Sequence, residues 1–560
     1  MEKHRSYLDK VAPATGHPLR ISRRGFIGLG GALAANSLLL PSVAGARPRQ
    51  TASLVNAVPG SVFDVRAYGA LGDGKTIDTP AVNRAIEAAA AAGGGTVRFP
   101  AGTYACYSIH LKSSVALYLD EGSTVLAAST PREGATSGGY DAAESNAPWE
   151  AYQDFGHNHW HNSLIWGEGL HDIAILGPGL IWGKGLSRGH AGDPDLPIAE
   201  RPGVGNKAIA LKNCRNVILR DFSLLAGGHF GILATGVDNF TVDNLIIDTN
   251  RDGMDIDCCR NVHVSNCTVN SPWDDGICPK STYALGYPRA TENVTISNCY
   301  VTGGYEMGSV VDGSYKRFGP EFDMNPWNRT GRIKCGTESN GGFKNITISN
   351  CTLESCRGLA LETVDGAVLE DITITGITMR DVRNSPLFFR LGGRMRGPKG
   401  LPLSTFRRVL VSNVTCSGPA NTMPSIISGI PGASIEDIKI SDFFVQQKGG
   451  GTNELNQWTP PEREADYPEP FRFGPLPAYG FFMRHVNNAE FSNVEIANVE
   501  ADARPALWLE DVNDSDFSRL TLSKGRGGPA FVLNKMSGFR VTGSRGLPDM
   551  ALSDIAHREI

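Results

Sequence analysis

The sequence has 560 residues, of which 41% are hydrophobic, 20% are charged, 66 are Gly and 33 are Pro. A hydrophobic fraction of this size can bury a core, which excludes a wholly disordered chain, and the Gly residues have no every-third-residue period, which excludes collagen. The formal net charge of −5 comes without a basic stripe, which excludes the charge pattern of a nucleic-acid-binding protein. At about 150 residues per domain, the length allows three or four domains or one long solenoid.

The first 46 residues have the pattern of an export signal. The segment 22–27 contains an Arg-Arg pair typical of twin-arginine signals, and an apolar run at 28–40 and small residues at 44–46 follow it. We expect residues 1–46 to be a signal peptide that directs export by the twin-arginine route, so that the protein is periplasmic or secreted. Its removal takes away six Lys/Arg and two Asp/Glu, which changes the net charge from −5 to −9. No stretch is long enough to cross a bilayer of about 30 Å, so no membrane span is expected.

A linker at 47–60 precedes a predicted N-terminal cap. The residues Asp-Thr-Pro at 78–80 are typical of a helix start, and the predicted helix ends at Ala92, before three Gly residues. A strand is predicted next, at 96–99. A short helical cap of this kind covers the apolar end of a solenoid.

The phrase Asn-Val-x-Ile-Ser-Asn recurs along most of the remaining chain, sometimes in a degenerate form. Its copies begin at Asn216, Asn239, Asn261, Asn293, Asn345, Asp371, Arg408, Asp437, Asn493 and Arg519. The intervals indicate one structural coil of about 22 to 26 residues plus insertions. Each phrase alternates apolar and polar residues, which predicts a strand, and ends at Asn, which tolerates a left-handed turn. Because one coil cannot bury its own apolar face, the coils must stack about 4.8 Å apart.

The stacked region is predicted to span residues 61–530, with a C-terminal tail at 531–560. Three long insertions, at 129–161, 314–331 and 446–479, are predicted to be loops that build the walls of a binding cleft.

Eleven cysteines are present, and we expect mostly free thiols. Cys267, Cys299 and Cys351 occupy the same place in the repeated phrase, which suggests one internal stack of small core residues. No Cys-x-x-Cys pair is present, so a structural zinc site is not expected. The residues His157, His159 and His161 have a metal-like spacing, but in a Trp- and Asn-rich loop this spacing favours a surface or substrate-facing loop. We expect no metal and no cofactor.

The repeat register predicts a column of polar residues on one face. Counting 13 residues from the first Asn of four successive phrases reaches His229, Asp252, Asp274 and Glu306. Asp275 adjoins the column. Closely placed carboxylates push their pKa values apart, so that one can be a general acid while another stays ionised as a base, as glycosidic bond cleavage requires. Turn chemistry is the structural alternative for a single Asp pair, and a calcium site is the functional alternative.

The motifs around these residues resemble those of the polygalacturonase group, glycoside hydrolase family 28 of the pectin-lyase-like superfamily. Asn250-Arg251-Asp252-Gly253 is similar to the family's Asn-x-Asp motif, Asp274-Asp275-Gly276 to its paired-aspartate motif, and Arg332-Ile333-Lys334 to its Arg-Ile-Lys motif. The opening segment at 63–104 is similar to the start of the wider superfamily. The resemblance covers roughly residues 60 to 525 and implies an all-β fold, a right-handed parallel β-helix with a short N-terminal helical cap.

The resemblance also implies roles for these residues. Asp274 would protonate the leaving oxygen, and Asp252 with Asp275 would hold and deprotonate the attacking water in an inverting hydrolysis. Asn250, Arg332 and Lys334 would contact the substrate, a galacturonate-containing pectic polysaccharide or oligosaccharide, whose carboxylate suits cations.

One family motif, Gly-His-Gly, is absent, and Met307 stands at the position of its histidine. We hypothesise that the neighbouring Glu306 faces the cleft there, and we include Glu306 and His229 among the predicted substrate-binding residues. A rhamnogalacturonan-directed hydrolase would tolerate a different residue at this position. A calcium-dependent pectate lyase and a non-catalytic carbohydrate-binding solenoid are the alternatives of other classes. The long insertions favour an exo-acting enzyme, and we expect a monomer.

Overall fold

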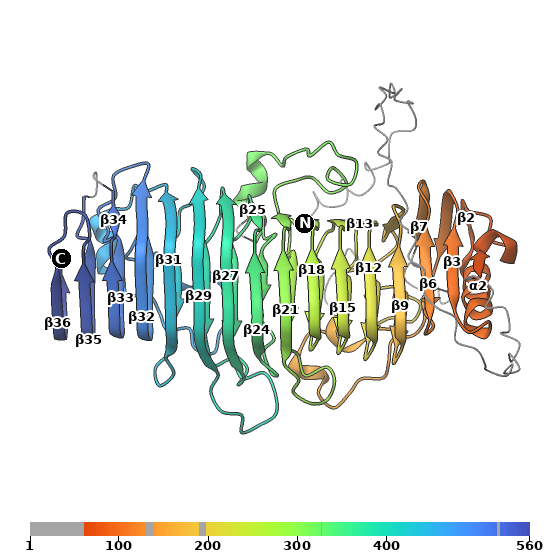
Figure 1. The fold of residues 1–560 in the computed structure, drawn as a ribbon, viewed down its shortest axis with the longest axis horizontal. Helices are drawn as coiled ribbons and strands as arrows, with labels where there is room; N and C mark the ends of the chain where they lie inside the picture. The colour runs from red at the N-terminus through yellow and green to blue at the C-terminus, as the bar shows by residue number, and fades with distance from the viewer. Residues whose placement is uncertain (1–60, 130–138, 190–197, 326, 524–526) are drawn as a thin grey trace, which may run out of the picture. The chain divides into compact units, whose positions relative to one another are not determined.

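The computed structural model describes residues 61–129, 139–189, 198–325, 327–523 and 527–560. Its 36 strands stack coil upon coil along one axis, and every pairing is parallel except the one between the last two strands (Figure 1). The fold is a right-handed parallel β-helix, which confirms the predicted fold class. The predicted signal peptide and linker lie outside the described residues. Within those residues, no helix is long and apolar enough to traverse a bilayer.

The coils have three faces, each covered by one parallel sheet. Sheet 1 carries the functional residues and consists of β5 (Ile109–His110), β8 (Ser163–Glu168), β11 (Lys207–Lys212), β14 (Phe230–Thr235), β17 (Asp252–Asp257), β20 (Ile277–Lys280), β23 (Ile333–Cys335), β26 (Leu359–Thr363), β28 (Leu387–Leu391), β30 (Ser425–Ser428), and the first parts of β32 (Phe481–Asn498), β33 (Leu507–Ser518) and β35 (Phe531–Thr542).

Sheets 2 and 3 complete each coil. Sheet 2 consists of β1 (Val62–Asp64), β3 (Gly95–Phe99), β6 (Val115–Leu119), β9 (His171–Leu176), β12 (Arg215–Arg220), β15 (Asp238–Asp243), β18 (Arg260–Ser265), β21 (Thr291–Ser297), β24 (Phe343–Ser349), β27 (Val368–Arg380), β29 (Thr405–Ser417) and β31 (Ile435–Gln447). Sheet 3 consists of β2 (Asp73–Ile77), β4 (Gly102–Cys106), β7 (Ser123–Ala127), β10 (Leu180–Trp182), β13 (Ser223–Leu225), β16 (Ile246–Asp248), β19 (Thr268–Asn270), β22 (Tyr300–Thr302) and β25 (Thr352–Glu354), while β34 (Thr521–Leu522) pairs with β32.

The repeated phrase forms the strands of sheet 2, as its alternation predicts. Its first Asn adopts a left-handed conformation in successive coils, with φ of 56° at Asn216, 54° at Asn239 and 57° at Asn261. These side chains hydrogen bond from coil to coil, because the Asn239 amide donates to Asn216 at 3.0 Å and the Asn261 amide donates to Asn239 at 3.1 Å. The repeat therefore marks a turn in which one Asn per coil accepts a left-handed backbone and links neighbouring coils.

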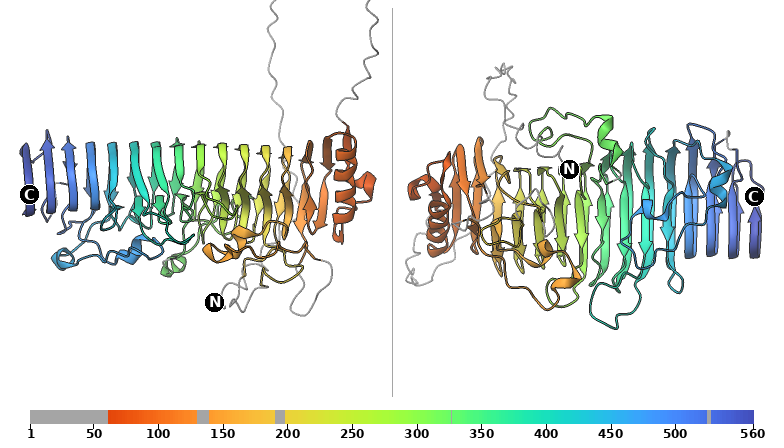
Figure 2. Two further views of the ribbon diagram at one scale, coloured as in Figure 1. Left: turned by 90° about the horizontal axis from the view of Figure 1, so that it is seen from below. Right: turned by 180° about the vertical axis from the view of Figure 1, so that it is seen from behind.

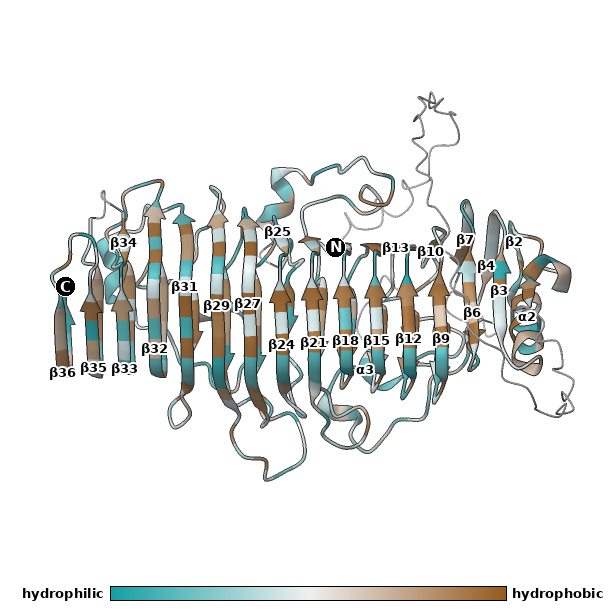
Figure 3. Ribbon diagram, in the orientation of Figure 1, coloured by the Kyte–Doolittle hydropathy of each residue, from teal (hydrophilic) through white to brown (hydrophobic). Residues whose placement is uncertain are grey.

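Alternate strand residues point into one continuous core, and the strands are accordingly banded in hydropathy (Figure 3). All eleven cysteines are buried and free, as expected. Cys267, Cys299 and Cys351 belong to the core at the same place in successive coils. The predicted internal stack of small residues is confirmed.

The two ends of the stack differ from each other. The predicted cap helix is α2 (Thr79–Ala91), which follows the 3₁₀ turn η2 (Val65–Tyr68) and buries its apolar face against the first coil. At the other end the structure extends the β-helix beyond residue 530. The residues predicted to be a tail form β35 and β36 (Met550–Glu559), and β36 closes the stack by pairing antiparallel with β35. Alternating apolar residues at 531–541 pack into the core, which explains the continuation.

The long insertions project from one side of the stack, and short helical turns stand out in them (Figure 2). These turns are η3 (Glu150–Tyr152), α3 (Phe155–Asn158), η4 (Pro320–Met324), η5 (Asn453–Gln457) and η6 (Pro470–Phe473). Trp160 pins the first insertion to sheet 1, because its buried ring lies under Lys212 and its Nε1 donates to the Thr235 hydroxyl at 3.1 Å. The insertions thus cover part of sheet 1.

Three stacked glycines allow the coils to approach closely where sheet 1 begins. A Cβ atom on Gly253 would lie 2.4 Å from the carbonyl oxygen of Gly276, and one on Gly231 would lie 2.5 Å from that of Gly253. We expect Gly253→Ala to lower the free energy of unfolding by about 1–3 kcal/mol, because the added methyl group meets rigid backbone. A lowered denaturation midpoint in urea checks this prediction.

The control is Gly400→Ala, at a glycine with a left-handed φ of 83° and open space around the position of a Cβ. It adds conformational strain without a backbone clash. A midpoint for Gly253→Ala equal to that of the parent would show that the coils can separate at this point without cost.

Candidate active site

Three carboxylates from two successive coils meet at one edge of sheet 1. Asp252 is the first residue of β17, and Asp274 and Asp275 immediately precede β20. One oxygen of each carboxylate lies within 4.8 Å of an oxygen of the other two. The backbone N–H of Asp275 donates to Asp252 Oδ1 at 3.2 Å and to Asp274 Oδ1 at 3.0 Å. The structure therefore brings together the three aspartates that the sequence singled out.

The register of the strands differs by one residue from the predicted column. Strand β14 pairs with β17 so that Phe230, not His229, lies opposite Asp252. The next pairing sets Met254 opposite Ile277, which places Asp252 beside Asp275. The reason is the turn before β17, which is one residue shorter than the turns in the coils on either side. The 13-residue offset therefore identifies the correct edge of the sheet but not the correct neighbours.

Arg251, the residue before Asp252, lies beside Asp274 of the next coil. The Arg251 Nε donates to Asp274 Oδ2 at 3.0 Å, and Arg251 Nη1 lies 2.7 Å from ring nitrogens of His229. Burial raises the pKa of Asp274, but the Arg251 charge, the hydrogen bond with Asp252 and the Lys334 charge together outweigh it, and the net shift is downward. Burial and the same guanidinium lower the pKa of His229 well below its usual range, so this imidazole is neutral. Asp274 is the most accessible of the three, with 31% of its side chain exposed.

Asp252 is buried, with 4% of its side chain exposed, and its nearest cation is Lys280 Nζ at 3.8 Å. Burial raises the pKa of Asp252 well above its usual range, and the charges of Asp274 and Asp255 raise it further. Asp274 in turn shares a side-chain hydrogen bond with Asp252. The pair therefore holds one proton between two carboxyl groups at a pH where an exposed aspartate has lost its own.

Asp275 is held by two cations. Arg332 Nε donates to Asp275 Oδ1 at 2.6 Å, and Lys334 Nζ lies 2.7 Å from Oδ2, with all three side chains at most 2% exposed. Burial raises the pKa of Asp275, but Arg332 and Lys334 overcome this effect and lower it far below its usual range. Asp275 is therefore ionised whenever the protein is folded at ordinary pH.

The insertion that follows β31 reaches over these cations. Glu469 Oε1 accepts hydrogen bonds from Arg332 at 2.8 Å and from Arg357 at 3.2 Å, and Tyr467 lies with its hydroxyl 3.3 Å from Lys334 Nζ. Glu469 is 2% exposed. The edge of the site is thus covered by residues that lie more than 100 positions further along the chain. No repeat signal marks them, because the insertion interrupts the periodic pattern.

Asn250 and Glu306, two other predicted site residues, have different neighbours from those of the three aspartates. The Asn250 carbonyl accepts a hydrogen bond from Arg188 at 2.9 Å, and its side-chain oxygen is buried without a partner among the described residues. Glu306 pairs with Lys316 at 2.6 Å and stands at the start of an insertion before β23. In the register of sheet 1, the backbone that follows Asp275 pairs instead with Arg332. The structure therefore does not bring Glu306 to the three aspartates.

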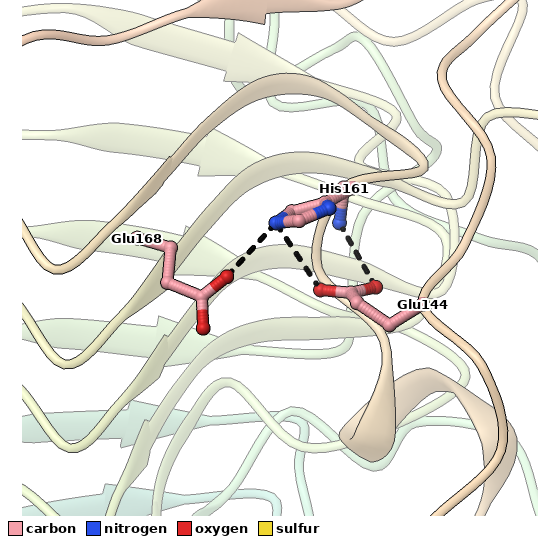
Figure 4. A group of neighbouring side chains, drawn as sticks. All are labelled: Glu144, His161 and Glu168. Carbon is pink, nitrogen blue, oxygen red and sulfur yellow. Dashed lines mark hydrogen bonds and ion pairs between the residues drawn. The ribbon is translucent and has the colours of Figure 1, made fainter.

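Of the histidines with metal-like spacing, His157 packs beside Asp255 at 3.5 Å, and His159 bonds to the Phe155 carbonyl at 2.8 Å. His161 forms the group drawn in Figure 4: its Nε2 lies 3.0 Å from Glu168 and 3.5 Å from Glu144. This group ties the first insertion to β8.

Two groups of side chains, in the part of the chain that the structure describes, are compact enough to hold a metal ion. In the first group, each carboxylate already has a cationic partner. Lys280 pairs with Asp252, Arg251 with Asp274, and Arg332 and Lys334 with Asp275. In the second, Lys212 Nζ lies 2.9 Å from Glu168, and His161 bridges both glutamates. These cations compete with a metal ion in both places. The chemistry that both groups favour is therefore hydrogen bonding and proton transfer.

Comparison with known proteins finds similar sequences over much of the chain. The family model described as "Rhamnogalacturonase A/epimerase, pectate lyase-like" matches residues 62–278. A probable polygalacturonase of Vitis vinifera is 24% identical over an alignment of 409 residues, and the match covers 66% of this chain and 77% of the relative. An exo-poly-alpha-D-galacturonosidase of Dickeya chrysanthemi is 23% identical over 462 residues, covering 69% of this chain and 72% of that protein.

The same fold occurs in solved structures. The exopolygalacturonase from Thermotoga maritima matches with a TM-score of 0.57 at 18% identity, and the match covers 79% of this chain and 92% of that one. The predicted resemblance is confirmed as far as these matches reach: the family model covers residues 62–278, and the matched relatives are polygalacturonases of 23–24% identity.

Proposed function

We propose that this protein is a glycoside hydrolase that cleaves galacturonate-containing pectic polysaccharide or oligosaccharide. The proposal rests on the observation that the carboxyl groups of Asp252, Asp274 and Asp275 differ in pKa and in exposure. Hydrolysis of a glycosidic bond needs one carboxyl group that holds a proton and one that does not. The polygalacturonase relatives support the choice of substrate class.

Asp274 acts as the general acid in this proposal, since it is the carboxyl group that a substrate can reach. The proton that Asp252 holds passes to Asp274 and then to the glycosidic oxygen as the bond to the anomeric carbon breaks. Asp252, now ionised, and Asp275 hold the attacking water and accept its proton. Arg332 and Lys334 keep Asp275 ionised for this step.

The carboxylate spacing bears on stereochemistry. A separation under 4.8 Å is shorter than the roughly 6.5–9.5 Å found between the two carboxyl groups of most inverting glycosidases. Direct attack by water inverts the anomeric centre, whereas a glycosyl-enzyme intermediate retains it. We expect inversion, and proton NMR of the first product formed decides: a retained anomer would make Asp252 or Asp275 a nucleophile.

An exo mode of action is part of the proposal. Residues from two insertions approach the carboxylates, with Asp154 3.4 Å from Arg251 and Glu469 against Arg332. Such walls favour a groove that accepts the end of a chain. Incubation with polygalacturonate tests this: release of monomers from the start supports exo action, and a ladder of intermediate lengths contradicts it.

A second candidate is a hydrolase directed at rhamnogalacturonan, and Glu469 favours it. Glu469 fills the space beside Arg332 and Arg357 with a carboxylate of the protein itself. A substrate with a neutral sugar at this position would not have to displace it. Comparison of rates on rhamnogalacturonan and polygalacturonate separates the two substrates, and Glu469→Gln should improve the rate on polygalacturonate only if the uronate must replace this carboxylate.

The alternatives of other classes make different predictions. A calcium-dependent lyase would lose activity in a chelator and give unsaturated products. A binding solenoid would give no products, and its ligand affinity would be unchanged by Asp274→Asn. We further propose export by the twin-arginine route and a monomeric state. Fusion of residues 1–46 to a reporter protein, with and without Arg23→Lys and Arg24→Lys, tests the export proposal.

The pH dependence of kcat/KM should reveal the shared proton. The rate falls as pH rises through the raised pKa of Asp252, because the proton needed by Asp274 is then lost. Among the causes of that raised pKa is the Asp255 charge, and both Asp255 oxygens lack hydrogen-bond partners among the described residues. Asp255→Asn should therefore move the alkaline limb of the profile to lower pH without loss of hydrogen bonds.

Asp257→Asn is the matched control, since Asp257 lies on the same face of β17 but bonds to Thr282. It should leave the alkaline limb in place. An alkaline limb that Asp255→Asn does not move, or moves to higher pH, would show that Asp252 does not hold the proton.

A further inference from the structure

The insertion that covers the catalytic cations also forms a separate, open cavity. The cavity has a volume of about 650 Å³ and is lined by residues of 458–474 alone, among them Trp458, Phe471, Arg463 and Arg472. None of the catalytic carboxylates or their cations lines it. Cavities of about 300–1,000 Å³ are typical of small-molecule sites.

The aromatic wall of this cavity is held in place. Trp458 Nε1 donates to the Phe473 carbonyl at 3.3 Å, yet 43% of the residue remains exposed. The Phe471 ring packs edge-on against Trp327, with ring centres 4.7 Å apart. The buried Phe473 ring packs against Phe388 of β28, outside the β-helix core. A fixed, half-exposed indole is the kind of surface on which a flat apolar face of a ligand packs.

The polar wall carries two guanidinium groups that share one carboxylate. Arg463 Nη1 lies 3.3 Å and Arg472 Nη1 lies 4.0 Å from Asp466 Oδ2, and the two arginine side chains are 49% and 40% exposed. Exposed ion pairs at such distances contribute about 0–1 kcal/mol, so a ligand can replace them at little cost. Arg463 and Arg472 are the two charged residues among those that line the cavity.

The cavity lies along the same face as the catalytic site. Phe473 rests on β28, which is three coils after β20, or about 14 Å at about 4.8 Å per coil. A sugar chain that follows sheet 1 from the carboxylates therefore runs toward the insertion that holds the cavity.

We propose that this cavity is an accessory binding site for a uronate-bearing oligosaccharide. The arginines bind a sugar carboxylate, for which a guanidinium has matching geometry, and the face of Trp458 packs on a sugar ring. The choice of ligand rests on the proposed function, because a pectic substrate supplies carboxylates at successive sugar units.

Titration calorimetry of the full chain with a galacturonate tetramer tests the proposal in the Asp274→Asn background, in which the ligand is not consumed. We expect two classes of site. Arg463→Gln combined with Arg472→Gln should remove one class or weaken it at least tenfold, and Trp458→Ala should do the same. Both positions are exposed, so the fold should survive. Arg98→Gln, at an exposed ion pair remote from the cavity, is the control and should change nothing.

Unchanged stoichiometry and affinity in the Arg463/Arg472 variant would overturn the proposal. Equal binding of a neutral maltotetraose in the cavity would overturn the uronate assignment. The result is independent of catalysis: a parent protein that does not hydrolyse pectin but loses one class of tetramer site in this variant refutes the proposed function and keeps the accessory site. Normal hydrolysis by the parent together with unaltered tetramer binding by the variant would support the proposed function and refute the accessory site.

Discussion

Asp274→Asn is expected to lower kcat about 10²–10⁴-fold, the usual contribution of a general acid, while the fold is preserved. The substituted amide cannot protonate a leaving oxygen, but its own oxygen can still accept the hydrogen bond from Arg251. Asp274 is partly exposed, so the change buries no new polar group. Product release from polygalacturonate and the far-UV circular dichroism spectrum measure the two effects.

A substrate whose leaving group needs no proton separates the general acid from the base. With a 4-nitrophenyl glycoside, Asp274→Asn should regain most of its lost rate, whereas Asp275→Asn should not. Glu306→Gln is the control, because Glu306 pairs with Lys316 away from the three aspartates, and it should behave as the parent does. If Glu306→Gln were as damaging as Asp274→Asn, the predicted role of Glu306 in the cleft would stand and the assignment of the acid would need revision.

Arg332→Gln is expected to lower the free energy of unfolding by about 3–5 kcal/mol, because two buried carboxylates, Asp275 and Glu469, each lose one of their two cations. Arg332 bonds to Asp275 and to Glu469, and all three side chains are at most 2% exposed. Catalysis should fall as well, since burial then raises the pKa of Asp275 with less opposition and the base is partly protonated. Urea denaturation and the acid limb of the pH profile measure the two effects.

The matched control is Arg317→Gln. Arg317 pairs with Glu354 at 2.6 Å, but its side chain is 48% exposed, so this loss should cost only about 0–1 kcal/mol. Equal stability losses in Arg332→Gln and Arg317→Gln would mean that the buried cluster does not depend on its arginine.

The periodic part of the fold could be predicted because each coil carries its own signal. The Asn residues at 216, 239 and 261 mark a left-handed turn, and the alternation after each of them marks a strand. The tail prediction failed because β35 and β36 follow the last recognisable phrase, at Arg519, and because Lys535 instead of Asn adopts the left-handed turn in β35.

The sequence predicted which aspartates belong to the site but not which of them are neighbours across the strands. The 13-residue offset finds Asp252 and Asp274, but a turn shortened by one residue places Asp252 beside Asp275 and sets Arg251 next to Asp274. The offset assumes turns of equal length, whereas the paired core residues Ile232, Met254 and Ile277 lie 16, 15 and 16 residues after the first Asn of their phrases. Lys280 could have been found, since it lies on the outward face of β20, two residues after Cys278.

Glu469 and Tyr467 could not have been predicted from the repeat. They belong to an insertion without periodicity, and their place beside Arg332 and Lys334 depends on how that loop folds back over sheet 1. Glu306 is the opposite case, a residue that the repeat selects but that the structure places away from the three aspartates. It satisfies the offset from Asn293, but the insertion that follows it carries the chain away before sheet 1 resumes at β23.

The central claim is that Asp252, Asp274 and Asp275 perform hydrolysis. The most direct test is mass spectrometry of the products released from polygalacturonate, with a chelator present and with Asp274→Asn as the comparison. We expect saturated products, each heavier by one water than an elimination product, from the parent and almost none from the variant. Unsaturated products that disappear in chelator, or saturated products formed equally by Asp274→Asn, would contradict it.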